Sequence, residues 1–243
     1  MSGHSKWHKI QHKKGKADAA RGSVFTKLCK AITVAAKDGG GDPGMNFSLR
    51  LAVEKAKAGN VPKDNIERAI KRGTGENRED LVLEENLYEG FGPGSVAFLV
   101  KTISDNKNRT VSEVKHAFSK HGGSMGSAGS VQWQFEEKGV VYLSAEQKTQ
   151  IDDWEAFELS LIDAGVEDIT VHDDGARIVT SRDKFKALMD TLEAADISFE
   201  ESGLKWMAKE EIHIDEGVIL QVEALYDALD ALDDTLEIFT NIA

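Results

Sequence analysis

The sequence has little cysteine and no long apolar run. With Cys29 as its one cysteine it can form no internal disulfide, which is typical of a protein from a reducing compartment. The longest apolar runs, such as Val96–Val100, fall far short of the roughly 18 residues that a membrane-spanning helix needs. No apolar segment follows the basic N-terminus, so nothing resembles a secretory signal. We therefore expect a cytoplasmic protein with no membrane partner.

The N-terminal end of the chain lacks acidic residues, and the C-terminal end lacks lysine and arginine. The first 17 residues contain no acid, and residues 215–243 contain eight acids and no Lys or Arg. Residues 1–78 hold 17 Lys and Arg against 7 Asp and Glu, whereas the whole chain of 243 residues has a net charge of −12. Such segregation is typical of a basic, polyanion-binding region on an acidic body. A solvated basic tail is the alternative.

The remaining composition is that of a globular protein, with 40% apolar and 30% charged residues. After a polar, basic arm, apolar residues recur at helical spacing from Ser23 to the glycines at 39–41. A second helix is indicated by Leu49, Val53 and Ala56, and a third follows Pro62 and ends at Gly73. We therefore predict a basic arm and a three-helix bundle over residues 1–78.

Beyond residue 79 the pattern changes to strands alternating with helices, among them a strand at 131–135 and a helix near 150–164. Residues 138–211 predict the order βαββαβ, which is a ferredoxin-like unit. The final helix and strand, over 217–240, have no partners of their own, so we expect them to return to the unit begun at 86–135. The predicted fold is α+β: a three-helix basic domain, then an α/β domain over 79–137 with 212–243, into which a second α/β, ferredoxin-like domain (138–211) is inserted.

Binding a phosphate backbone requires several cations on one accessible surface. The arm, the first helix and the third helix supply Lys6, Lys9, Lys13, Lys14, Lys16, Arg21, Lys27, Lys30, Arg68, Lys71 and Arg72. Trp7 either stacks on a base or ribose, or ties the arm to the bundle as an apolar plug. No helix carries a set of Asn, Gln and Arg residues arranged to read base edges.

A polar segment, Ser104–Arg109, leads from a strand into the next helix. Its residues suit turns and caps, and Thr110 with Glu113 forms a capping box that would open the helix. The functional alternative is an exposed loop that contacts RNA or a partner through Asn106, Lys107, Arg109 and Lys115. For the acidic C-terminal helix, the alternatives are a solvated face and a nucleic-acid mimic that competes for the basic region.

Catalytic and metal chemistry is not indicated. Cys29 lies in an amphipathic pattern without a matched His and Asp arrangement. His4, His8 and His12 lack the Cys or carboxylate ligands that would complete a zinc site. Neither glycine-rich segment, at 39–41 or 72–75, has the Gly-Lys-Ser/Thr of a phosphate loop. We expect no enzyme, no metal, no cofactor and no small-molecule substrate.

Several motifs along the chain resemble the YebC/PmpR family. They are Met1–Trp7, Arg21-Gly22, Phe25–Lys27, Gly39–Pro43, Arg68–Gly73, Tyr88–Gly94, Ser104–Thr110, Gly129–Val131 and Ala164–Asp168. Together they cover nearly the whole chain in the right order. The departures are Phe47-Ser48, where a Pro-Arg pair is common, and Ser95, where glycine is usual.

The resemblance implies a helical N-terminal domain, two α/β domains and a cytoplasmic protein acting on nucleic acid. Bacterial members are labelled probable DNA-binding transcriptional regulators, whereas other members, including mitochondrial translational activators, act at the ribosome. We therefore expect a non-enzymatic regulator of gene expression that binds DNA and controls transcription. The alternative is a ribosome-associated translation factor that binds RNA, which the acidic body and the lack of a base-reading helix favour.

Overall fold

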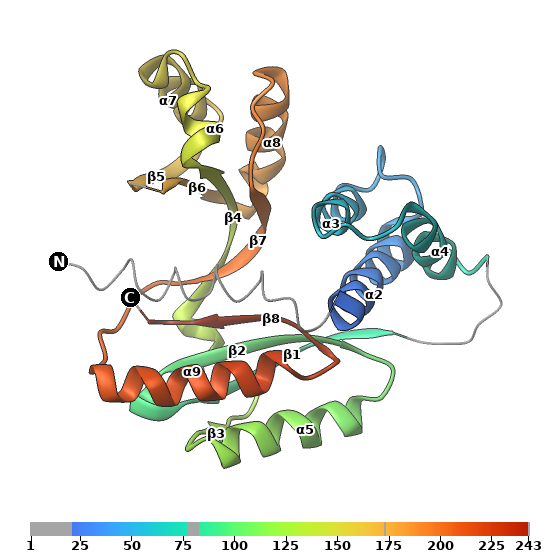
Figure 1. The fold of residues 1–243 in the computed structure, drawn as a ribbon, viewed down its shortest axis with the longest axis vertical. Coiled ribbons are helices and arrows are strands. Elements are labelled where there is room, and N and C mark those ends of the chain that lie inside the picture. Colours follow the sequence, from blue (N-terminus) through green and yellow to red (C-terminus); the bar gives the residue numbers. More distant parts are fainter. Residues whose placement is uncertain (1–20, 77–82, 173, 243) are drawn as a thin grey trace. The chain divides into compact units, whose positions relative to one another are not determined.

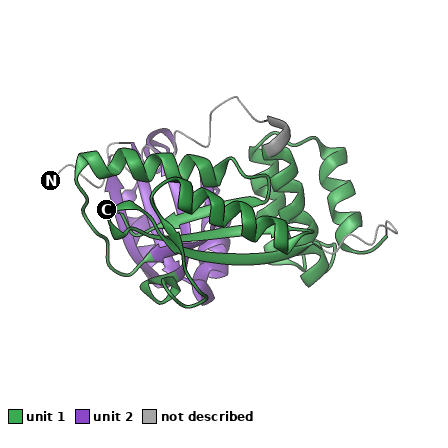
Figure 2. Ribbon diagram, turned by 90° about the horizontal axis from the view of Figure 1, so that it is seen from below, with its two compact units in different colours: residues 1–136, 208–243 green, residues 137–207 purple. Residues whose placement is uncertain are grey.

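The computed structural model describes residues 21–76, 83–172 and 174–242. The chain forms two compact units, which are described separately: residues 1–136 with 208–243, and residues 137–207 (Figure 2).

The first unit begins with the three expected helices, α2 (Arg21–Gly39), α3 (Phe47–Ala58) and α4 (Lys63–Gly73). Their core includes Ile32 and Leu49, both fully buried. Helix α2 ends where Gly40 takes a φ of 89°, and the Asn46 side chain caps α3 by accepting from the Leu49 N–H. At Gly73, α4 approaches α2 so closely that a Cβ would lie 2.3 Å from the Thr33 carbonyl oxygen.

A four-stranded sheet completes the first unit, in the order β3-β1-β2-β8. The strands are β1 (Glu84–Phe91), β2 (Ala97–Ser104), β3 (Ser124–Met125) and β8 (Thr235–Thr240), and each pair is antiparallel. Helices α5 (Lys107–Lys120) and α9 (Glu216–Asp230) cover one face of this sheet (Figure 1). Since β8 pairs with β2, the expectation that the C-terminal segment returns to this sheet is confirmed.

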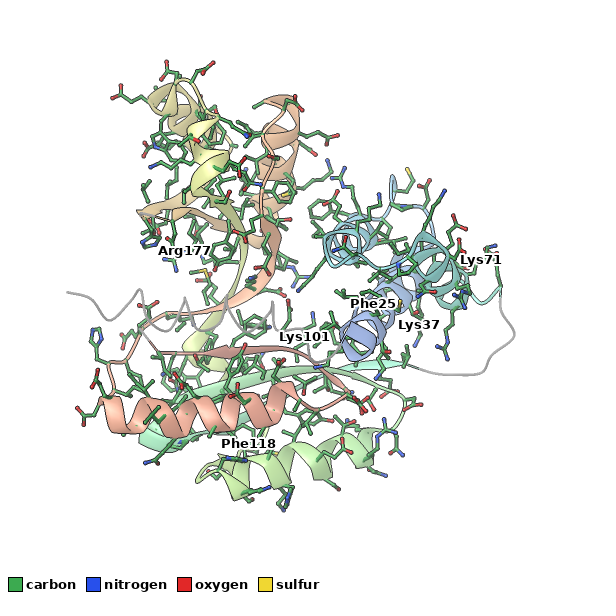
Figure 3. All side chains as sticks on the ribbon, viewed as in Figure 1. Phe25, Lys37, Lys71, Lys101, Phe118 and Arg177 are labelled. Atoms are coloured by element: carbon green, nitrogen blue, oxygen red, sulfur yellow. The ribbon has the colours of Figure 1, made fainter. Side chains whose placement is uncertain are left out.

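The core of this sheet is apolar and well packed. Phe118 on α5 lies between the helix and the sheet (Figure 3), and its ring meets that of Phe98 edge to face at 5.9 Å. Helix α9 adds Val222, Leu225 and Leu229, all fully buried. Ser95, at the hairpin between β1 and β2, has a φ of 60°, a conformation that explains why glycine suits this position.

The second unit has the predicted βαββαβ order. Its strands are β4 (Phe135–Ser144), β5 (Val166–His172), β6 (Gly175–Ser181) and β7 (Glu201–Ala208), and its helices are α6 (Ala145–Thr149), α7 (Trp154–Asp163) and α8 (Phe185–Ala194). The spatial order β5-β6-β4-β7, antiparallel where β6 meets β4 and β5, is that of a ferredoxin-like sheet. The α+β fold predicted from the sequence is thus confirmed.

One predicted strand, one helix start and one helix cap differ from the structure. Residues 131–135 were expected to form a strand, but Gln132–Gln134 form a 3₁₀ turn and β4 begins only at Phe135. The helix expected over 150–164 begins at Trp154, capped by Asp153. Helix α5 is opened by Asn106, whose side chain accepts from the Arg109 N–H, and not by a capping box at Thr110.

Candidate nucleic-acid interface

The predicted cations of the arm lie outside the described residues. These are Lys6, Lys9, Lys13, Lys14 and Lys16, together with Trp7. Arg21 begins α2, and its side chain is not described either. The structure therefore bears on the remaining candidates, which lie on α2, α4 and α5.

Helix α4 presents an outward-facing set of cations. Lys63, Arg68 and Lys71 are exposed and Arg72 is half-buried, while Ile66 and Ala69 face the bundle. Arg68 donates to the Asp64 carbonyl oxygen and to the Asn65 side chain on its own helix. Within the described part of the chain Lys71 has no ion-pair partner, and it lies at the outer edge of the helical bundle (Figure 3). Arg68 and Lys71 are thus accessible to an anionic ligand.

Lys27 and Lys30 have a different environment from the one expected. Lys27 donates to the Asp230 carbonyl oxygen at 2.6 Å, and Lys30 forms a 2.7 Å ion pair with Asp234. Burial lowers the pKa of Lys27, although Asp230 and Asp233 oppose this shift. Because acids near the C-terminus already compensate these two ammonium groups, they are less available to phosphate than α4 is.

A third lysine of the helical bundle contacts the same C-terminal segment. Lys55 on α3 pairs with Glu237 on β8. Beside these ion pairs, Val34 of α2 packs with Leu83 and Ile103 in a small apolar cluster. The acids at 230–237 therefore help to hold the helical bundle against the sheet, a role that neither sequence-based interpretation of the acidic C-terminus included.

Asp234 is the centre of a buried polar network. Its side chain is 1% exposed and accepts hydrogen bonds from Ser104 and Thr110, each at 2.8 Å. Arg109 donates to the same carboxylate at 2.8 Å, opposite Lys30. Burial raises the pKa of Asp234, but the hydrogen bonds from Arg109, Lys30, Thr110 and Ser104 outweigh burial and hold it well below its usual range.

This network divides the 104–115 segment into two sets of residues. Asn106 caps α5, and Arg109 binds both Asp105 and Asp234, so these two side chains serve the fold of the segment. Lys107 and Lys115 are exposed on α5, with Lys120 on the last turn of the same helix. Arg109 is also exposed but ion-paired, so of the predicted loop contacts Lys107 and Lys115 are the cations for which no ion pair is described.

A second buried carboxylate, Glu89 on β1, escaped the sequence analysis. Only 3% exposed, it accepts from the backbone N–H groups of Gly129, Val131 and Gln132 at 2.6–2.8 Å. These bonds shape the turn that replaces the expected strand and that presents Trp133. The sequence feature that could have pointed to this loop is the absence of charged residues over 122–135, in a chain of which 30% is charged.

Catalytic and metal-binding groups were also sought. Cys29 is half-buried, and burial raises the pKa of its thiol, which is opposite to the activation that a nucleophile needs. No cluster of three or more His, Cys, Asp or Glu side chains suited to a metal occurs among the described residues. Among the helices of that same part of the chain, none is long and apolar enough to cross a membrane.

The fold and these surfaces define an α+β protein with a cation-bearing helical region followed by two antiparallel sheets with helices. Residues 5–76 match the profile described as the TACO1/YebC protein N-terminal domain, and residues 83–242 match the one described as the TACO1/YebC second and third domain. The chain belongs to the TACO1/YebC family.

Its relatives span the full length. A protein of Herpetosiphon aurantiacus is 45% identical over 100% of this chain and 94% of its own, and one of Thiobacillus denitrificans is 47% identical over 99% and 98%. Both are named "probable transcriptional regulatory protein", and neither name describes an enzyme. The crystal structure of a conserved hypothetical protein, Aq1575 from Aquifex aeolicus, superposes with a TM-score of 0.83 at 38% identity, covering 94% of this chain and 93% of that one.

Proposed function

We propose that the protein is a non-enzymatic, cytoplasmic regulator of gene expression that binds DNA through its basic N-terminal region and controls transcription. The observation that carries this proposal is the pair of accessible cations on α4, Arg68 and Lys71, in the part of the chain where base exceeds acid. The names of the relatives support the assignment to transcription.

Electrostatics makes this region the site of polyanion binding. Each phosphate neutralised by a lysine or arginine releases condensed counterions, so affinity grows with the number of cations on the face. The acidic remainder of the chain repels a polyanion. Lys27 and Lys30 contribute less than the sequence suggests, because Asp230 and Asp234 already contact them.

Removing the charges of Arg68 and Lys71 tests the DNA-binding surface proposed on α4. In the double variant Arg68→Gln, Lys71→Gln, affinity for duplex DNA should fall, and the slope of log affinity against log salt should decrease by about 2, because two phosphate contacts are lost. Fluorescence anisotropy of a labelled duplex over a range of salt concentrations measures both quantities.

The matched control is Lys184→Gln, Lys186→Gln, which removes two exposed lysines from the second unit. Its salt slope should equal that of the wild type. An unchanged slope in the α4 variant, or an equal decrease in the control, would refute a DNA-binding face on α4.

A second candidate is a ribosome-associated translation factor that binds RNA. The observation that favours it is that α5 also carries exposed lysines, Lys107, Lys115 and Lys120, and no base-reading set of side chains.

Co-sedimentation with ribosomes at about 0.15 M salt, with and without excess duplex DNA, separates the two functions. If transcription is the role, DNA should remove the protein from the ribosome pellet. Retention despite the DNA would instead make translation the primary function. The variant Lys107→Gln, Lys115→Gln should then reduce retention.

A further inference from the structure

Trp133 is an exposed aromatic residue that neither function uses. It is 67% exposed, although tryptophan side chains are among the largest apolar groups that proteins usually cover. Its neighbours Val131 and Phe135 are buried, so the turn between them directs this one ring outward. An exposed indole beside two buried residues indicates a contact surface.

The loop around Trp133 is held in place. Glu89 accepts three backbone N–H groups from residues 129–132, and the Gly126 N–H donates to the Glu89 carbonyl oxygen at 2.8 Å. The 3₁₀ turn closes with a bond from the Gln134 N–H to the Val131 carbonyl oxygen. Because the backbone is fixed before any ligand arrives, binding at Trp133 requires little ordering of the chain.

The hydrogen bonding of the indole limits what it can bind. Its one donor, Nε1–H, is directed to the Ser130 carbonyl oxygen at 3.2 Å. A ligand must therefore use the face of the ring. Stacking of a nucleobase needs only that face and is tolerant of sequence, since every base has a π-face.

One cation at this loop suits the phosphate of a nucleic acid. Residues 122–135 contain no acid, and the buried Glu89 carboxylate is satisfied by the N–H groups of the loop, while the acids nearest in sequence are Glu136, Glu137 and Glu210. The ammonium of Lys209 donates to the Trp133 backbone carbonyl oxygen at 2.9 Å, which places a cation at the backbone of this turn. A stacked base and a phosphate paired with Lys209 would then belong to one strand.

We propose that Trp133 is a stacking site for an unpaired nucleobase of a single-stranded nucleic acid, and that Lys209, which is bonded to the Trp133 backbone carbonyl, meets a phosphate of the same strand. Bases within a duplex are covered by their neighbours, so the site is selective for unpaired segments. This proposal rests on the nucleic-acid function proposed above and adds to it a second site, on the sheet-containing part of the first unit.

The test compares a labelled single-stranded RNA of twelve nucleotides with a duplex DNA of the same length, using the full chain and fluorescence anisotropy. Trp133→Ala should weaken binding of the single strand by about 5- to 150-fold, the range of one lost base–aromatic stack. Trp133→Phe, which keeps a ring, should recover most of that loss. Duplex binding should remain within about twofold of the wild type, because the α4 cations are unaffected.

Leu220→Ala is the control, since Leu220 is equally exposed, at 68%, on α9. It should leave both affinities unchanged. If Trp133→Ala binds the single strand as the wild type does, the stacking site is refuted and the α4 face stands. If the wild type binds neither probe, the nucleic-acid function itself fails, and Trp133 is then to be assigned to a protein partner.

Discussion

Asp234→Ala is expected to lower the free energy of unfolding by about 3–5 kcal/mol, the usual cost of removing one partner from a buried ion pair. The substitution removes the carboxylate acceptor that Ser104 and Thr110 share and leaves the ammonium of Lys30 without its ion-pair partner. Urea unfolding followed by circular dichroism measures the change. The Asp234→Ala substitution should also loosen the helical bundle, which is detectable as faster proteolysis of α2–α4.

The neighbouring acid provides the control. Asp233 is exposed, and only its backbone carbonyl is bonded to Lys30, so Asp233→Asn should change stability by no more than about 0.5 kcal/mol. Equal effects of the two substitutions would show that net acidity of the segment, and not the Asp234 network, holds the bundle.

The contribution of Asp234 to stability should decrease as the pH falls. Since the pKa of Asp234 in the folded state lies well below its ordinary value, its contribution to stability is fully present above about pH 4 and is lost as pH falls through the folded-state pKa. The difference in stability between the wild type and Asp234→Ala should therefore shrink in acid. A constant difference down to about pH 2 would contradict this origin.

Glu89→Ala should lower the free energy of unfolding by roughly 2–4 kcal/mol, because three backbone N–H groups in or near the interior lose their acceptor. Glu89→Gln should cost less, since the amide keeps one oxygen acceptor. Hydrogen exchange measures the local effect: the amides of Val131 and Gln132 should lose protection in both variants, more so in Glu89→Ala. Retained protection in Glu89→Ala would show that the loop is held by other contacts.

Low pH should destabilise this loop in the same way as Glu89→Ala does. Burial raises the pKa of Glu89, but the N–H groups of Val131, Gly129 and Gln132 outweigh burial and bring it below the ordinary value. The loop is thus most stable above about pH 4.5, and its stability is lost as pH falls through the folded-state pKa of Glu89. Glu84→Gln, on an exposed residue of the same strand, should leave the loop unaffected.

The sequence predicted most of the architecture because that architecture follows from local periodicity. Apolar residues at helical spacing identified α3 through Leu49, Val53 and Ala56, all of which are buried. The order of strands and helices in the second unit was sufficient for its ferredoxin-like topology, since few arrangements of βαββαβ are sterically allowed. The return of the C-terminal strand to the first sheet followed from its lack of nearby partners, whereas its pairing with β2 came only from the structure.

The polar contacts were not predictable in the same way. Lys30 and Asp234 are 204 residues apart, and nothing distinguishes Asp234 from the seven other acids in its segment. Lys30 was therefore taken for a phosphate contact. Glu89 was unpredictable for a related reason: an acid in a strand normally faces solvent, and only the three-dimensional loop supplies the N–H groups that satisfy it. Periodicity predicts which residues are buried, but it does not identify the partner of a buried charge.

Because β8 pairs with β2, the first sheet can be completed only at the end of synthesis. Strand β2 leaves the ribosome long before residues 235–240, and the whole of the second unit is made in between. Until the last residues emerge, β2 has an unpaired edge, and the apolar surface around Phe98 and Val100 lacks the cover of α9. Exposed edges of this kind are where nascent chains associate wrongly. All residues of the compact inserted unit have therefore been made before the first sheet can be completed.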